Sequence, residues 1–158
     1  MIDPRGQRFA AAVTTVVLAA VLLLDSPALL ALQAVAFGLA VALGPARSPY
    51  GVVYARLVRP RIGPPAELED ARPPRFAQTV GLGFALAGLL AYGVGAPAAA
   101  AVAVGGALAA AFLNAAFGIC LGCELYLTYR RIVARETPAL AAVRPDVRTD
   151  IEAKEVSA

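Results

Sequence analysis

The 158-residue chain contains no histidine and only two cysteines. A structural zinc site takes four Cys or His ligands, so one copy of the chain supplies only half a set, and four thiolates from a homodimer are disfavoured. The sequence also contains no P-loop, no G-x-G-x-x-G motif and no nucleophile elbow. We therefore expect neither a metal ion nor a bound cofactor.

Charged residues are scarce and unevenly placed. They make up 16% of the chain, and none occurs within 9–24, 26–46 or 76–123. Soluble domains average about a quarter charged residues. The chain is 59% hydrophobic, with a mean hydropathy of +0.70. This composition predicts an all-α integral membrane protein.

The apolar runs predict four transmembrane helices, because a span needs about 20 apolar residues. They are expected at 9–24, 27–43, about 76–93 and 97–119. The turn signal in Gly93-Val94-Gly95-Ala96-Pro97 divides the longest run. The first run resembles a signal peptide, but it lacks a small-residue cleavage site and other spans follow, so we retain it as a helix.

All fourteen Lys and Arg residues fall on one side of this topology, and the opposite turns carry only Asp25. The positive-inside rule then places both termini and the 44–75 loop in the cytoplasm. The expected location is the cell inner (plasma) membrane, as a multi-pass protein. The net charge of +3 reflects arginines beside the spans, which contact anionic headgroups of the lipid bilayer, and no nucleic-acid partner is expected.

The chain contains an internal repeat. Residues 3–10 and 70–77 share the pattern D-x-R-x-x-R-F-A at an offset of 67. Each copy opens a two-helix hairpin, so the repeats (3–61 and 70–131) are parallel rather than inverted. Together they form a four-helix membrane domain over 1–131, followed by a basic and polar cytoplasmic tail over 132–158 that is expected to be mobile.

The repeated element has two interpretations. Asp3 and Asp70 are expected to cap the following helix or to pair with a nearby arginine, which is a structural role. The arginines then fix the helix starts at the interface, or alternatively they form a pseudo-symmetric site for an anion. These arginines are Arg5, Arg8, Arg72 and Arg75.

The segment after the second span predicts a short interfacial helix. Ser48 followed by Pro49 is a good helix start, and the helix is expected to run to about Val58 and to end before Pro60. Aligning the two halves through Gly51 and Gly122 predicts a second interfacial helix over about 120–135.

The cysteines occur as Cys120-Leu121-Gly122-Cys123, where the last apolar span meets a basic segment. At a helix N-terminus a thiolate is favoured, as in other C-x-x-C motifs. If the last span instead continues through Gly122, the helix dipole opposes the thiolate. Glu124 would accept a proton from Cys123 or remain an exposed charge.

A packing role is the alternative for the cysteines, on a small-residue helix face that includes Gly118 and Gly122. Asn114, Thr14 and Gln33 are polar residues within the spans, and we expect them to bond across helices as structural residues.

Four segments resemble the bacterial integral-membrane family catalogued as domain of unknown function 4395. The segments are 3–9, 48–51, 73–77 and 117–124, and the resemblance covers about 1–131. The Ala-, Val- and Arg-rich composition is similar to actinobacterial members. The resemblance implies no established activity. Members are often encoded near thioredoxin-like proteins and sulfurtransferases, which implies thiol or sulfur chemistry.

The leading hypothesis is a dithiol, Cys120 and Cys123, that exchanges electrons or sulfur with a cytoplasmic thioredoxin-like or sulfurtransferase partner. Cys120 would attack and Cys123 would resolve the mixed disulfide, with Glu124 as the third catalytic residue. Two alternatives stay open. The first is a non-catalytic scaffold or accessory subunit, including a homo-oligomer, and the second is a small transporter for a sulfur-containing anion.

Overall fold

The computed structural model describes residues 2–63, 65 and 68–136, and these residues form an all-helical fold, as predicted. The long helices are α1 (Pro4–Leu24), α2 (Pro27–Leu43), α5 (Arg72–Gly93) and α6 (Pro97–Phe117). A helical segment between α2 and α5 consists of η1 (Pro45–Arg47), α3 (Pro49–Val53), η2 (Tyr54–Val58) and α4 (Arg59–Ile62). The last helix is α7 (Leu121–Glu136).

The chain divides into two units, Met1–Tyr126 and Leu127–Ala158. The first unit holds the helix bundle and the first residues of α7. The second holds the rest of α7. Residues 132–136, which we expected in the tail, belong to α7, because the helix runs to Glu136. The expectation of a mobile tail over 137–158 lies outside the described residues.

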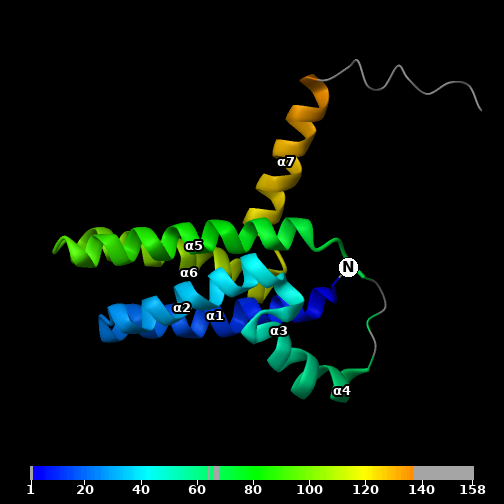
Figure 1. Ribbon diagram of the computed structural model, residues 1–158, viewed down its shortest axis with the longest axis horizontal. Coiled ribbons are helices and arrows are strands. Elements are labelled where there is room, and N and C mark those ends of the chain that lie inside the picture. Colours follow the sequence, from blue (N-terminus) through cyan, green and yellow to red (C-terminus); the bar gives the residue numbers. More distant parts are fainter. Residues whose placement is uncertain (1, 64, 66–67, 137–158) are drawn as a thin grey trace, which may run out of the picture. The chain divides into compact units, whose positions relative to one another are not determined.

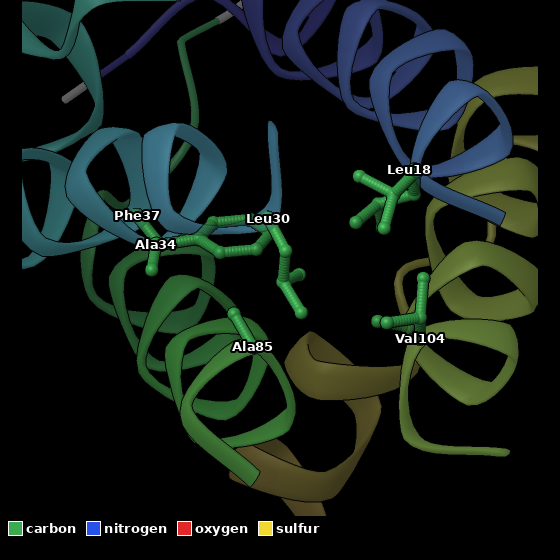
Figure 2. Packing of buried hydrophobic residues seen from close by; sticks show 8 residues of the cluster. Leu18, Leu30, Ala34, Phe37, Ala85 and Val104 are labelled. Atoms are coloured by element: carbon green, nitrogen blue, oxygen red, sulfur yellow. The ribbon is translucent and has the colours of Figure 1, made fainter. Parts of the chain in front are cut away.

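The four long helices form a bundle, in which α1 packs against α6 and α2, and α5 packs against α2 and α6 (Figure 1). Leu18 and Leu30 are fully buried at its centre, close to Phe37 and Val104 (Figure 2). Small residues let the helices approach one another. A Cβ atom at Gly88 would lie 2.9 Å from a methyl group of Leu30 and 3.3 Å from one of Val104.

Helices α1 and α5 begin earlier than the predicted spans, at Pro4 and Arg72 rather than at residues 9 and 76. Proline fits the first turn of a helix, where its missing N–H leaves no bond unmade. The repeated aspartates add a second cause. Asp3 accepts a hydrogen bond from the Arg5 N–H at 2.9 Å, and Asp70 accepts one from the Arg72 N–H at 3.0 Å. Asp3 is thus the N-cap of α1, as predicted. The cap position of α5 is Ala71, so Asp70 stands one residue before it and its side chain bonds to the Arg72 N–H.

The interfacial helix begins as predicted but ends later. Ser48 Oγ accepts a hydrogen bond from the Gly51 N–H at 3.1 Å. The prediction that Pro60 stops the helix is wrong, because the helical path continues to Ile62. The π-helical turn η2 precedes the proline, and the Arg59 N–H bonds to the Tyr54 carbonyl. In a regular α-helix the proline ring clashes with the carbonyl group four residues earlier. We attribute the continuation to the wider π-helical turn, which shifts that carbonyl group relative to Pro60.

Three helices, α1, α5 and α6, are long and apolar enough to span a membrane, and α2 is a shorter apolar helix of 17 residues. Large apolar side chains also cover the outside of the bundle. Leu23 is 84% exposed, Val102 77% and Leu90 71%. An apolar surface of this kind is unusual in a soluble monomer.

Candidate dithiol site

The cysteine pair lies at the junction between α6 and α7. Gly118 ends α6 in the left-handed conformation, with φ of +72°, and α7 begins at Leu121. The Glu124 N–H donates to the Cys120 carbonyl at 3.0 Å, which is the first bond of the new helix. The predicted helix over 120–135 is therefore confirmed, and a span running straight through Gly122 is excluded. The packing alternative required Gly118 and Gly122 to lie on one face of a single helix. They belong to different segments, so this requirement is not met.

Cys120 and Cys123 are joined as a disulfide, with their Cα atoms 5.2 Å apart. That separation lies within the usual range of about 4.4–6.8 Å for bridged cysteines. The Cys123 N–H also donates to Cys120 Sγ at 3.3 Å. Cys120 therefore occupies the capping position of α7, where backbone N–H groups stabilise negative charge.

Gln7 contacts the cysteine pair, and the sequence analysis did not identify it as part of this site. Its Nε2 donates to Cys123 Sγ at 3.4 Å. The signal was present in the helical period, because Gln7 falls on the face of α1 that buries Ala11, Thr14 and Leu18. The second copy of the repeat has Pro74 at the equivalent position, so the amide belongs to the first copy alone.

Gly122, within the cysteine motif, lies directly against α5. A Cβ atom there would be 2.6 Å from both Cα and Cβ of Ala77. Real Cβ atoms do not approach backbone this closely, so a side chain would push the two segments apart. The glycine between the two cysteines is therefore required by the close packing of this segment against α5.

A cavity of about 80 Å³ lies beside the cysteines. All four bundle helices contribute to it, and Cys120 lines it whereas Cys123 does not. Its polar lining consists of Gln7, Thr14, Gln78 and Asn114. Of the residues that the structure describes, none with a charged side chain lines it. Asn114, predicted as a structural residue, therefore faces the same space as Cys120.

A second cavity, of about 180 Å³, lies between the start of α1 and the segment that follows α2. Ile2, Pro45 and Leu68 contribute apolar surface to it, and Asp3 and Arg59 contribute charge. Gln7, Pro74 and Gln78 line both cavities. The two cavities are therefore neighbours, with the two glutamine amides at the boundary.

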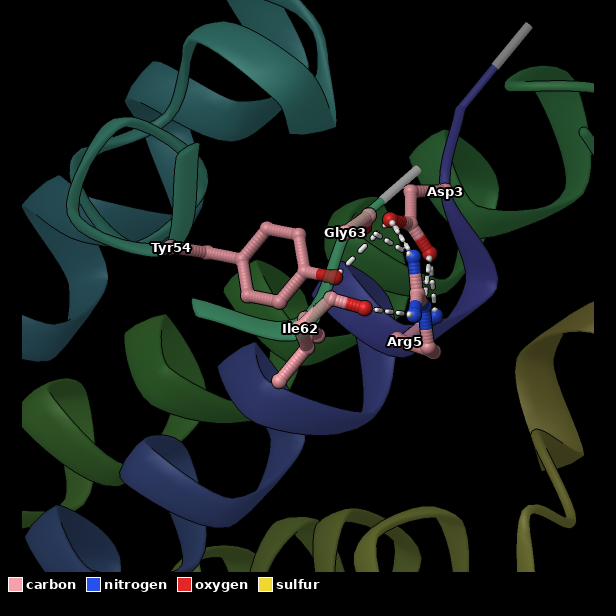
Figure 3. A network of polar contacts seen from close by, with 5 residues as sticks. All are labelled: Asp3, Arg5, Tyr54, Ile62 and Gly63. Atoms are coloured by element: carbon pink, nitrogen blue, oxygen red, sulfur yellow. Dashed lines mark hydrogen bonds and ion pairs between the residues drawn. The ribbon is translucent and has the colours of Figure 1, made fainter. Parts of the chain in front are cut away.

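Asp3 is the centre of a polar network at the larger cavity (Figure 3). Its carboxylate accepts the Tyr54 hydroxyl at 2.8 Å and forms an ion pair with Arg5 at 3.2 Å. Arg5 also donates to the Gly63 carbonyl at 3.0 Å. Burial alone would raise the pKa of Asp3, but the hydrogen bonds from Arg5 and Tyr54 outweigh it and lower the pKa. Burial and the bond to Asp3 both raise the pKa of Tyr54.

Arg8 and Arg75, the equivalent arginines of the repeat, contact the ends of other helices. Arg8 donates to the Ala115 and Ala116 carbonyls of α6 at 3.3 and 3.4 Å. Arg75 donates to the Val41 and Ala42 carbonyls of α2 at 2.6 and 3.1 Å. Together with Arg5, these arginines have distinct protein partners, and the backbone of Arg72 bonds to Asp70. The anion site stays a prediction.

Two further polar predictions concern the bundle interior and the end of the motif. Gln33 donates to Thr14 at 3.4 Å and accepts the Tyr50 hydroxyl at 2.6 Å, so the predicted bonding across helices is confirmed for this pair. Glu124 is exposed in the first turn of α7. Among the described residues, no hydrogen bond or ion pair joins its carboxylate to either cysteine. Its catalytic role stays a prediction.

These features define an all-helical protein with a disulfide-forming cysteine pair at the start of its last helix. The chain belongs to the family described as Domain of unknown function (DUF4395), whose model matches residues 2–131. The resemblance stated from the sequence is thereby confirmed. Comparison with curated proteins and with solved structures gives no match.

Proposed function

We propose that this protein is embedded in the cell inner membrane through α1, α2, α5 and α6. The 17 residues of α2 reach the lower limit of about 17 for a span. The exposed apolar side chains of the bundle support this placement, because lipid would cover them. The Lys and Arg distribution supports cytoplasmic termini.

The proposal includes two parallel repeats. The reciprocal contacts support it, because Arg8 of the first repeat contacts the end of α6 in the second, and Arg75 of the second contacts the end of α2 in the first. The packing of α1 on α6 matches that of α5 on α2 in the same way. A rotation axis along the membrane normal would relate both pairs.

The function that the site supports best is thiol–disulfide exchange at the cytoplasmic face, with a thioredoxin-like protein as partner. The observation that carries this proposal is the position of Cys120 at the start of α7, where the Cys123 N–H points at its sulfur. That donor and the helix N-terminus favour a Cys120 thiolate in the reduced protein. The 5.2 Å Cα separation allows the pair to close again as a disulfide.

The exchange requires no other reagent. The Cys120 thiolate attacks one sulfur of the partner's disulfide, and the other partner sulfur leaves as a thiolate. Cys123, after losing its proton to solvent or Glu124, attacks Cys120 Sγ in the mixed disulfide. The partner leaves as a dithiol, and two electrons have passed to it from the cysteine pair.

Trapping tests this assignment. Reduced Cys123→Ser protein in membranes, mixed with an oxidised thioredoxin, should accumulate a mixed disulfide through Cys120, detected by non-reducing electrophoresis and mass spectrometry. Cys120→Ser is the matched control and should trap much less. A Cys120→Ala, Cys123→Ala variant that keeps the cellular role of the protein, or a Cys123→Ser variant that traps nothing, would contradict the proposal and favour the scaffold.

A further inference from the structure

We propose that the smaller cavity is a binding site for hydrosulfide, which enters the bundle and attacks Cys120 in the disulfide. This inference deepens the proposed function and rests on it, since it identifies a small-molecule electron donor for the same cysteine pair. It depends on the size of the cavity, the character of its lining and the different surroundings of the two sulfur atoms.

The cavity admits only a very small reagent. Its volume is about 80 Å³, about half that of a cavity of about 150 Å³ that binds benzene. Glutathione, a quinone ring or a peptide thiol therefore does not fit. A species with one or two heavy atoms does.

The lining favours a species that is neutral or carries one diffuse negative charge. In the part of the chain that the structure describes, no arginine, lysine or carboxylate lines the cavity, so a dianion such as sulfate would be buried there without a counter-charge, at a high cost. The carboxamides of Gln7, Gln78 and Asn114 each carry N–H donors that a monoanion accepts. Hydrogen sulfide matches both conditions, because it enters uncharged and reacts as hydrosulfide.

The two sulfur atoms have different roles in this geometry. Cys120 lines the cavity and Cys123 does not. Cys123 does not occupy the capping position of α7. Its Sγ instead accepts a hydrogen bond from the Gln7 amide at 3.4 Å. A nucleophile in the cavity therefore meets Cys120, and Cys123 leaves as a thiolate that the Gln7 amide stabilises. Because Cys120 Sγ also has a donor, the Cys123 N–H, access from the cavity selects the sulfur that is attacked.

The step balances without another reagent. Hydrogen sulfide loses a proton to solvent, and the resulting hydrosulfide forms a bond to Cys120 Sγ as the Cys120–Cys123 bond breaks. The products are a persulfide on Cys120 and a thiolate on Cys123. Transfer of the outer sulfur to an acceptor thiolate restores the dithiol, which the partner disulfide then oxidises. Two electrons of sulfide thereby reach the partner.

The larger cavity provides a route to this site. It has a volume of about 180 Å³ and shares Gln7, Pro74 and Gln78 with the smaller cavity. Its charged residues, Asp3 and Arg59, lie at the polar end of the bundle near the start of α1. A neutral molecule would reach Cys120 from the larger cavity past Gln7 and Gln78, which line both cavities.

Two reagents acting on the same oxidised, full-length protein in nanodiscs test the inference. Sodium sulfide probes the cavity, and a reduced thioredoxin probes the outer approach to the disulfide. Sulfide should add one sulfur atom at Cys120, located by mass spectrometry after alkylation. Asn114→Leu, which replaces an amide of the cavity lining with a larger apolar side chain, should slow the sulfide reaction by about tenfold, the effect of about 1.4 kcal/mol in the barrier. The rate at which the Asn114→Leu protein reacts with thioredoxin should stay within about twofold of the rate of the unsubstituted protein.

Ala109→Leu is the matched control, because it adds the same side chain to an exposed position of α6 and should change neither rate. A persulfide on Cys123, or an Asn114→Leu protein that reacts with sulfide at the normal rate, would overturn the cavity site. Thioredoxin exchange would then still stand. Loss of thioredoxin exchange in the unsubstituted protein would instead contradict the proposed function.

Discussion

Gln7 connects the first helix of the bundle to the cysteine pair through a single side-chain hydrogen bond. A neutral amide donor stabilises a thiolate more than a disulfide sulfur, so the contact favours the reduced form. This effect belongs to one residue and is measurable as a redox potential.

Replacing Gln7 with methionine, which keeps the length of the side chain, is expected to make the cysteine pair more reducing. A hydrogen bond contributes about 1 kcal/mol, which corresponds to about 20 mV for a two-electron couple. Equilibration with glutathione buffers measures the shift. Gln78→Met, on the same cavity but without a contact to sulfur, is the control, and an equal shift there would contradict the assignment.

Gly122 makes a second residue-scale prediction. Gly122→Ala should destabilise the protein by about 1–3 kcal/mol, because the added Cβ overlaps Ala77 and the junction must shift. Thermal unfolding in detergent measures the loss. Gly105→Ala, where a Cβ meets open space in the middle of α6, is expected to be neutral or stabilising by up to about 1 kcal/mol. Equal effects of the two substitutions would refute the packing argument.

The sequence singles out the chemically distinctive residues but not their neighbours. Cys120, Cys123 and the capping aspartates stand out by type and spacing. Gln7 and Tyr54 do not, because their contacts join segments about 50 or more positions apart: Tyr54 reaches Asp3, and Gln7 reaches Cys123. Such contacts depend on how the helices pack, which no local pattern specifies.

At the scale of the helices, starts and breaks follow from local chemistry. Ser48 has the predicted capping role, and Ser26 and Gly118 also cap helices, because caps depend on a few adjacent residues. The end of the interfacial helix was mispredicted at Pro60. The π-helical turn before it is a backbone adjustment over several residues, and the sequence carries no signal for it.

The two reciprocal arginines allow a prediction that separates stability from reactivity. Arg8→Gln and Arg75→Gln should each destabilise the bundle by about 1 kcal/mol, because each removes a positive charge from carbonyls at a helix C-terminus. Only Arg8→Gln should also change how fast the reduced cysteines are alkylated, since its partners lie just before the Cys120 junction. An equal change in alkylation for Arg75→Gln would show that general loosening is responsible.

For the whole molecule, the number of apolar runs predicts the number of long helices, because each run is separated by strong turn residues such as Ser26-Pro27 and Gly95-Ala96-Pro97. The pairing of the helices is not encoded in those runs. The contacts of α1 with α6 and of α2 with α5 join distant parts of the chain, and Arg8 and Arg75 each form a hydrogen bond across one of these pairs.

Labelling in intact cells tests the topology that we propose. In a Cys120→Ser, Cys123→Ser background, Val94→Cys should react with a membrane-impermeant maleimide, because the proposed topology puts the α5–α6 turn on the outer side. Leu68→Cys, between α4 and α5, should react only after the cells are permeabilised. Both positions are exposed. The reverse pattern would overturn the cytoplasmic location of the cysteine pair.

The disulfide also bears on the start of α7 itself. It links residues three apart across the first helical turn, which is the turn whose ordering makes helix nucleation unfavourable by about a thousandfold. In the oxidised protein a covalent bond restrains that turn, and in the reduced protein it must form unaided. The amide hydrogens of Leu125 and Tyr126 should therefore exchange with deuterium faster after reduction. The redox state of the two cysteines would then control how stable the start of α7 is.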